Sequence, residues 1–89
     1  AAELNVHRIE AYLKVIDKFY KRMERLVNAT ERRGIDVSGI RPDLDDAYAR
    51  ICGVYDLGPE DISRAIAKLI EARNLLEQVQ RGLIEIKRA

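Results

Sequence analysis

Residues 62–86, ISRAIAKLIEARNLLEQVQRGLIEI, carry apolar side chains at alternating steps of three and four positions. This spacing places them on one side of an α-helix with a seven-residue repeat, which is typical of helical bundles and coiled coils. Pro59, Glu60 and Asp61 favour the first turn of such a helix, and Gly82 is expected to weaken its end by about 1 kcal/mol relative to alanine. We therefore predict a helix over residues 59–87, and its apolar positions are Ile62, Ala65, Leu69, Ala72, Leu76, Val79, Leu83 and Ile86.

The first third of the chain has the same periodicity and predicts a helix over residues 3–33. Gly34 follows this helix and can adopt the left-handed conformation that closes a helix, with Ile35 packing back on the last turn. Its apolar positions are Ile9, Leu13, Ile16, Tyr20, Met23 and Val27, and Tyr12, Phe19 and Leu26 widen the same stripe.

A short helix is predicted over residues 42–55, because Pro42 and Asp43 again provide a start signal and the pattern breaks near Gly58. No alternation typical of β-strands occurs between the helices. The 89 residues thus predict one all-α domain, a three-helix bundle with long, short and long helices and coiled-coil-like seams on the outer two.

Composition excludes several classes of protein. Hydrophobic residues make up 47% of the chain, which is too many for a disordered segment. The net charge of +1 gives no overall field toward nucleic acid, which is not expected as a partner. No apolar run approaches the roughly 20 residues of a transmembrane helix.

The unequal helix lengths predict association. A middle helix less than half as long as its neighbours cannot cover both apolar seams, so a second copy or another helical protein is expected to cover the rest. The partner is either the chain itself, in a structural role, or a helix received by a cytoplasmic adaptor. A closed monomer is the alternative. The predicted interface comprises Leu13, Ile16, Tyr20, Met23, Leu69, Leu76, Val79 and Leu83.

No constellation for catalysis, a cofactor or a metal is recognisable, so we expect no enzyme. His7 has no nearby partner, and Asp43, Asp45 and Asp46 suit a helix N-terminus without a metal. Cys52 fits a small filler of the short helix's stripe, or an intermolecular disulfide in a secreted oligomer.

Two features bear on the compartment. Asn28-Ala29-Thr30 matches the N-glycosylation pattern, which makes Asn28 a candidate site if the protein is secreted. The start Ala1-Ala2-Glu3 suits a mature end after signal-peptide cleavage, and equally a fragment of a longer chain. An extracytoplasmic location is favoured over a cytoplasmic one.

The segment from Ala29 to Ile40, ATERRGIDVSGI, resembles the helix end and turn of helical secreted or cell-surface proteins of archaea. In those proteins a helix closes on glycine, a hydrophobic-Asp-Val-Ser turn follows, and a second helix begins. Residues 57–62, LGPEDI, are similar to their next hairpin, although Pro42 and Cys52 depart from the pattern. The resemblance implies an extracytoplasmic spacer or assembly module without catalytic residues.

The helix order and Leu57-Gly58-Pro59 are also similar to the all-helical chorismate mutases. Their active sites place several arginines and a lysine inside the bundle. The seam from Ile9 to Val27 contains no inward arginine, so the resemblance does not carry over the activity.

Overall fold

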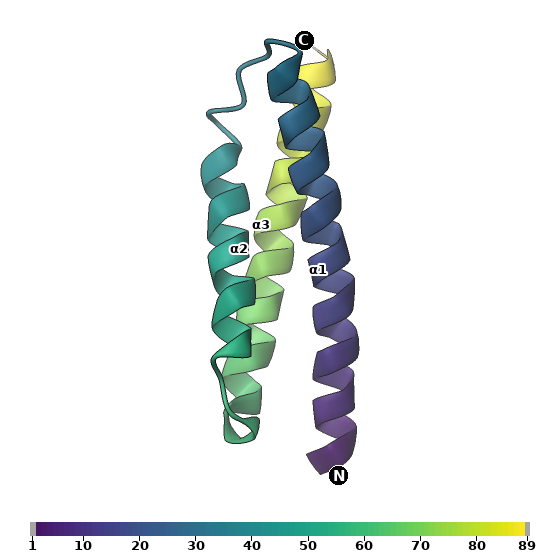
Figure 1. The fold of residues 1–89 in the computed structure, drawn as a ribbon, viewed down its shortest axis with the longest axis vertical. Coiled ribbons are helices and arrows are strands. Elements are labelled where there is room, and N and C mark those ends of the chain that lie inside the picture. Colours follow the sequence, from purple (N-terminus) through teal and green to yellow (C-terminus); the bar gives the residue numbers. More distant parts are fainter. Residues whose placement is uncertain (1, 89) are drawn as a thin grey trace.

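Three helices pack side by side in an elongated bundle (Figure 1). The structure is a computed structural model that describes the backbone of residues 2–88 and the side chains of residues 7–58 and 60–87. Within that part of the chain, the elements are α1 (Ala2–Arg32), α2 (Arg41–Tyr55), a single 3₁₀ turn η1 (Pro59–Asp61) and α3 (Ile62–Arg88). The predicted all-α three-helix bundle is confirmed.

The helices run up, down and up, so α1 and α3 are parallel and α2 is antiparallel to both (Figure 1). The bundle measures 49 × 17 × 16 Å, and its long dimension follows the helix axes. Each pair of helices is in contact, and α3 packs against both α1 and α2. The long helix α3 is therefore the element on which the other two assemble.

The end of α1 is closed by the predicted glycine. Gly34 has a φ of +84°, in the left-handed region that side chains with a Cβ disfavour. Its N–H donates to the carbonyl of Glu31 at 2.9 Å, and the N–H of Ile35 donates to that of Thr30 at 3.3 Å. These two bonds define the Schellman motif, which satisfies carbonyls that the helix leaves free.

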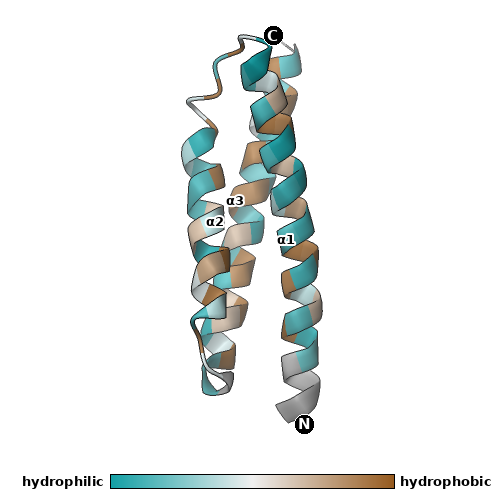
Figure 2. Ribbon diagram, viewed as in Figure 1, coloured by the Kyte–Doolittle hydropathy of each residue, from teal (hydrophilic) through white to brown (hydrophobic). Residues whose placement is uncertain are grey.

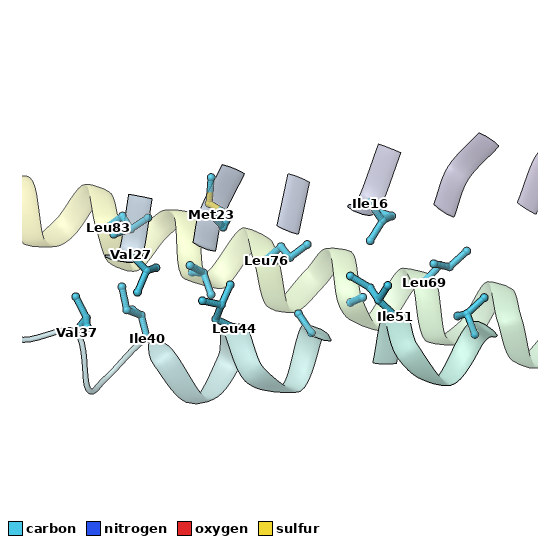
Figure 3. Packing of buried hydrophobic residues seen from close by; sticks show 14 of the residues in the cluster. Ile16, Met23, Val27, Val37, Ile40, Leu44, Ile51, Leu69, Leu76 and Leu83 are labelled. Carbon is cyan, nitrogen blue, oxygen red and sulfur yellow. The ribbon is translucent and has the colours of Figure 1, made fainter. Parts of the chain in front are cut away.

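The core is a continuous column of buried apolar side chains from all three helices. Figure 3 shows Ile16, Met23 and Val27 of α1 directed toward Leu44 and Ile51 of α2 and toward α3. Every residue of the predicted stripe on α3 between Ala65 and Leu83 is buried. The seven-residue spacing read from the sequence therefore identifies the core-facing side of α3.

The sequence predicted that the short middle helix would leave the apolar seams of its neighbours uncovered. In the structure these seams are covered. The connection between α1 and α2 covers the end of the bundle beyond the start of α2, with Val37 and Ile40 buried against the core (Figure 3). Non-helical chain can advance about 3.3 Å per residue, against 1.5 Å in a helix. A few residues of connection therefore replace helical turns that α2 lacks.

Gly82, which the sequence marked only as a weak point of the helix, is a packing site. The helix α3 continues past it to Arg88. A Cβ at Gly82 would overlap Cγ2 of Ile40. Ile40 therefore occupies the space that a side chain at position 82 would need. At this end of the core, Ile40 can approach α3 closely because position 82 is glycine.

Replacing Gly82 by alanine should destabilise the protein by about 1 kcal/mol or more, because overpacking against Ile40 outweighs the gain in helix propensity. Gly53→Ala in α2 is the matched control. A Cβ there meets only the flexible Lys68 side chain, at 3.4 Å, so this variant should gain about 0.5–1 kcal/mol. Urea unfolding measures both changes, and a stabilised Gly82→Ala would contradict the packing role.

Leu76→Ala should lower the free energy of unfolding by about 2–5 kcal/mol, since it empties a site at the centre of the core. Ile84→Ala on the same helix should cost less than about 1 kcal/mol. Leu76 is 0% exposed and Ile84 is 46% exposed. Equal losses for the two variants in thermal or urea unfolding would show that the assigned core is wrong.

Candidate interaction surfaces

Six of the eight side chains predicted to form an interface lie instead inside the single chain. Leu13 and Tyr20 are half-buried and pack against the core. The other six are buried: Ile16, Met23, Leu69, Leu76, Val79 and Leu83. They cannot meet a partner while the bundle is folded, because α2 and the connection after α1 already cover them. The apolar surface that remains is a different one.

That surface lies along the outer side of the contact between α1 and α3, and we call it the α1–α3 face. Tyr12 of α1 and Ile66 of α3 line the same shallow cleft, which shows that these sides of the two helices adjoin. Steps of three, four or seven residues continue each stripe along its helix. The face comprises Tyr12, Val15, Phe19 and Leu26 of α1 with Ile66, Ile70 and Ile84 of α3.

The α1–α3 face concentrates the exposed apolar side chains of the molecule. Figure 2 shows apolar and hydrophilic residues alternating along each helix, as in any amphipathic bundle. Within the described part of the chain, eight large hydrophobic residues are exposed, and five belong to this face: Val15, Leu26, Ile66, Ile70 and Ile84. The sequence signal for the face was the group of apolar residues that flanks the seven-residue stripes.

Cations border the α1–α3 face along α1. Arg8 lines the cleft with Tyr12 and Ile66, and Lys18 lies one turn from Val15. The guanidinium of Arg22 lies 5.4 Å from the centroid of the Phe19 ring, a cation–π contact. On α3, Arg73 Nε is 3.9 Å from Glu77 Oε1. The face is therefore apolar in its middle and basic at its α1 edge.

A second surface, the α1–α2 face, combines tyrosines with carboxylates. It comprises Tyr20 and Glu24 of α1 with Asp45, Tyr48 and Tyr55 of α2. The Tyr20 and Tyr48 rings are 5.4 Å apart, and the Tyr20 hydroxyl donates to Glu24 Oε2 at 2.8 Å. Burial, and then the Glu24 carboxylate, raise the pKa of Tyr20 above its usual range. The Cys52 side chain raises the pKa of Tyr48.

Arg41 joins the start of α2 to α1. Its Nη2 donates to Asn28 Oδ1 at 3.1 Å and to Glu31 Oε2 at 3.2 Å. Asn28, the candidate glycosylation site, is thus half-buried within a helix with its side-chain oxygen already bonded.

The other candidate residues do not converge on a site. The His7 side chain is 81% exposed, with Nδ1 3.9 Å from Glu10 Oε2, and Cys52 is half-buried on α2. Among the side chains that the structure describes, no polar or charged residue is buried and no group of three or more potential ligands could hold a metal. Inward arginines of the chorismate mutase type are therefore not found in residues 7–58 and 60–87.

A small apolar cleft opens at the end of the bundle near the N-terminal half of α1. Ile9 and Leu13 of α1, Tyr55 of α2 and Leu57 line it, and its volume is about 250 Å³. Binding sites for small molecules usually exceed about 300 Å³ and carry several directed polar groups. The cleft does not have the character of a cofactor site.

Comparisons with known proteins add no relative. No protein-family model matches the chain, and no curated protein or solved structure is significantly similar to it. The resemblance to archaeal secreted or cell-surface proteins stays a prediction. In residues 2–88, no helix combines the length and the apolar character needed to cross a membrane.

Glu24→Gln should lower the pKa of Tyr20, because it removes the anionic acceptor, while burial keeps that pKa above about 10. NMR of isotope-labelled tyrosine follows the titration, and Tyr20→Phe identifies the signal. The folded chain holds this proton more tightly than the unfolded chain does. The stabilisation from Tyr20 is therefore complete below pH of about 10 and is lost as the pH rises through the folded pKa. An unchanged titration in Glu24→Gln would contradict this contact.

Proposed function

We propose that this protein is a helical association module that binds copies of itself through the α1–α3 face. The observation that supports the proposal is the gathering of five of the eight exposed large hydrophobic residues on that one face. Apolar side chains that gather on one exposed face often mark a site of protein–protein interaction.

The geometry of the face suits a helical partner. The helices α1 and α3 run parallel (Figure 1), and Phe19 and Tyr12 of α1 are half-buried. A helix laid along such a pair would bury its own apolar stripe and complete a four-helix arrangement. Each square ångström of apolar surface removed from water contributes about 25 cal/mol.

The basic edge of the face narrows the choice of partner. Arg8, Lys18 and Arg22 lie along this side of α1 and would oppose another basic surface. A partner surface with carboxylates beside apolar side chains is favoured instead. An adaptor that receives an acidic amphipathic helix from another protein is the second candidate function, and it uses the same face.

The resemblance to archaeal cell-surface proteins supports a structural role, and the extracytoplasmic location belongs to this proposal. A module of this kind needs no catalytic residue. Its task would be to hold copies of the chain, or of the protein that contains it, in a fixed relation.

The double variant Val15→Glu/Ile70→Glu should weaken self-association at least about tenfold, because it places carboxylates on the face where apolar side chains would be buried. Sedimentation velocity from low-micromolar to near-millimolar concentration measures this. Both positions are exposed, so circular dichroism and the thermal unfolding midpoint should remain close to those of the wild type.

Ile35→Glu is the matched control, since Ile35 and Ile70 are each 39% exposed but Ile35 lies in the connection after α1. It should associate as the wild type does. A wild type that stays monomeric throughout would refute self-association. Undiminished association of the double variant would refute the assigned face.

A further inference from the structure

The carboxylates of α1 are distributed unequally around the helix. Acidic residues recur every seventh position, at Glu10, Asp17, Glu24 and Glu31. Seven residues are about two turns, so these carboxylates share one side of the helix. Glu31 contacts Arg41 of α2, and Glu24 accepts a hydrogen bond from Tyr20, whose ring lies 5.4 Å from that of Tyr48 of α2. The acidic side of α1 is therefore the side toward α2.

Cations border the other side. Arg8, Lys18 and Arg22 lie toward the α1–α3 face, and the one carboxylate of its α3 stripe, Glu77, is near Arg73. Near the α1–α2 face, by contrast, Asp17 pairs with Lys21 and Glu31 with Arg41, while Glu24 and Asp45 form no ion pair among the described side chains. One helix thus gives a basic edge to one face and an acidic edge to the next.

The α1–α2 face also has the composition of an interface. Tyr48 is 53% exposed and Tyr55 is 67% exposed, and both lie on the same side of α2 as Asp45. Tyrosine is enriched at interfaces, where its ring adds apolar area and its hydroxyl remains able to bond. This face offers the carboxylates and apolar area that the α1–α3 face requires.

We infer that copies of this chain associate head to tail, with the α1–α3 face of one copy on the α1–α2 face of the next. This inference rests on the proposed function and specifies its partner. A symmetric pairing of two α1–α3 faces would bring Arg8, Lys18 and Arg22 of both copies together, which costs free energy. The head-to-tail arrangement sets them against Asp17, Glu24 and Asp45.

Such pairing leaves one free face of each kind on every open assembly. A heterologous interface closes into a ring or continues as a filament, according to the rotation between neighbours. Because the complementary charges are at exposed edges, raising the salt concentration should weaken the association.

Mixing two face-specific variants tests the inference. Val15→Glu/Ile70→Glu disables the α1–α3 face, and Tyr48→Gln/Tyr55→Gln removes the exposed rings of the α1–α2 face. Each variant alone should associate at least about tenfold more weakly than the wild type, because each lacks one half of the contact. An equimolar mixture should form a complex of two chains that does not grow further, since it contains one intact face of each kind.

Other outcomes overturn the inference and identify what is wrong. If Tyr48→Gln/Tyr55→Gln self-associates like the wild type, the α1–α3 faces pair symmetrically, and the proposed function survives. If the wild type is monomeric but sediments with anionic phospholipid vesicles, the basic apolar face binds a lipid surface instead. A wild type that does neither refutes the proposed function together with this inference.

One measurement and one replacement variant guard against a loss of association that is caused by misfolding. Circular dichroism must give the helical content of the wild type for every variant. If Val15→Glu/Ile70→Glu is unfolded, Lys18→Glu/Arg22→Glu takes its place, because it changes only exposed charges at the same edge. The mixture should again recover the two-chain complex that neither variant forms alone.

Discussion

The structure depends on burying the continuous apolar stripe of α3, which the chain covers from two directions. Leu69, Leu76 and Val79 have no exposed surface, so both neighbours must approach α3 closely along its length. The long helix α1 does this from one side. On the other side α2 is short, and Val37 and Ile40 of the connection cover what α2 does not reach. Gly82 makes that approach sterically feasible.

This solution decides which apolar surface is left over. Three helices around one core leave grooves on the outside, and the chain fills them differently. The groove between α1 and α2 carries tyrosines and carboxylates, whereas the one between α1 and α3 carries Val15, Ile66 and Ile70 in water. In four-helix bundles, a fourth helix covers exposed apolar side chains on two adjacent helices. The proposed function is based on this distribution of apolar side chains and does not depend on a catalytic or ligand-binding group.

In the proposed association, charge determines which face of one copy meets which face of the next. Burial of apolar area does not distinguish one helical partner from another, but opposite charges at the edges do. Glu24 and Glu31 of α1 lie toward α2, whereas Arg22 lies over Phe19 on the side toward α3. A molecule with unlike faces on one helix is suited to repeated, ordered assembly more than to a single symmetric dimer.

The sequence by itself determined the helices, the closing role of Gly34 and the core positions of α3, because these follow from periodicity and from local backbone preferences. It also contained the flanking residues Ile66 and Ile70 and the spaced carboxylates of α1. It could not rank the apolar residues into core and surface. When an apolar stripe is wider than the area that one neighbouring helix covers, the positions of the neighbouring helices decide which of its residues are buried and which are exposed. Only the tertiary structure decided that the chain's own α1 and α2 cover the stripe of α3, that Val37 and Ile40 extend the cover of a short helix, and that Gly82 makes room for Ile40. Each of these results depends on contacts between residues far apart in the chain.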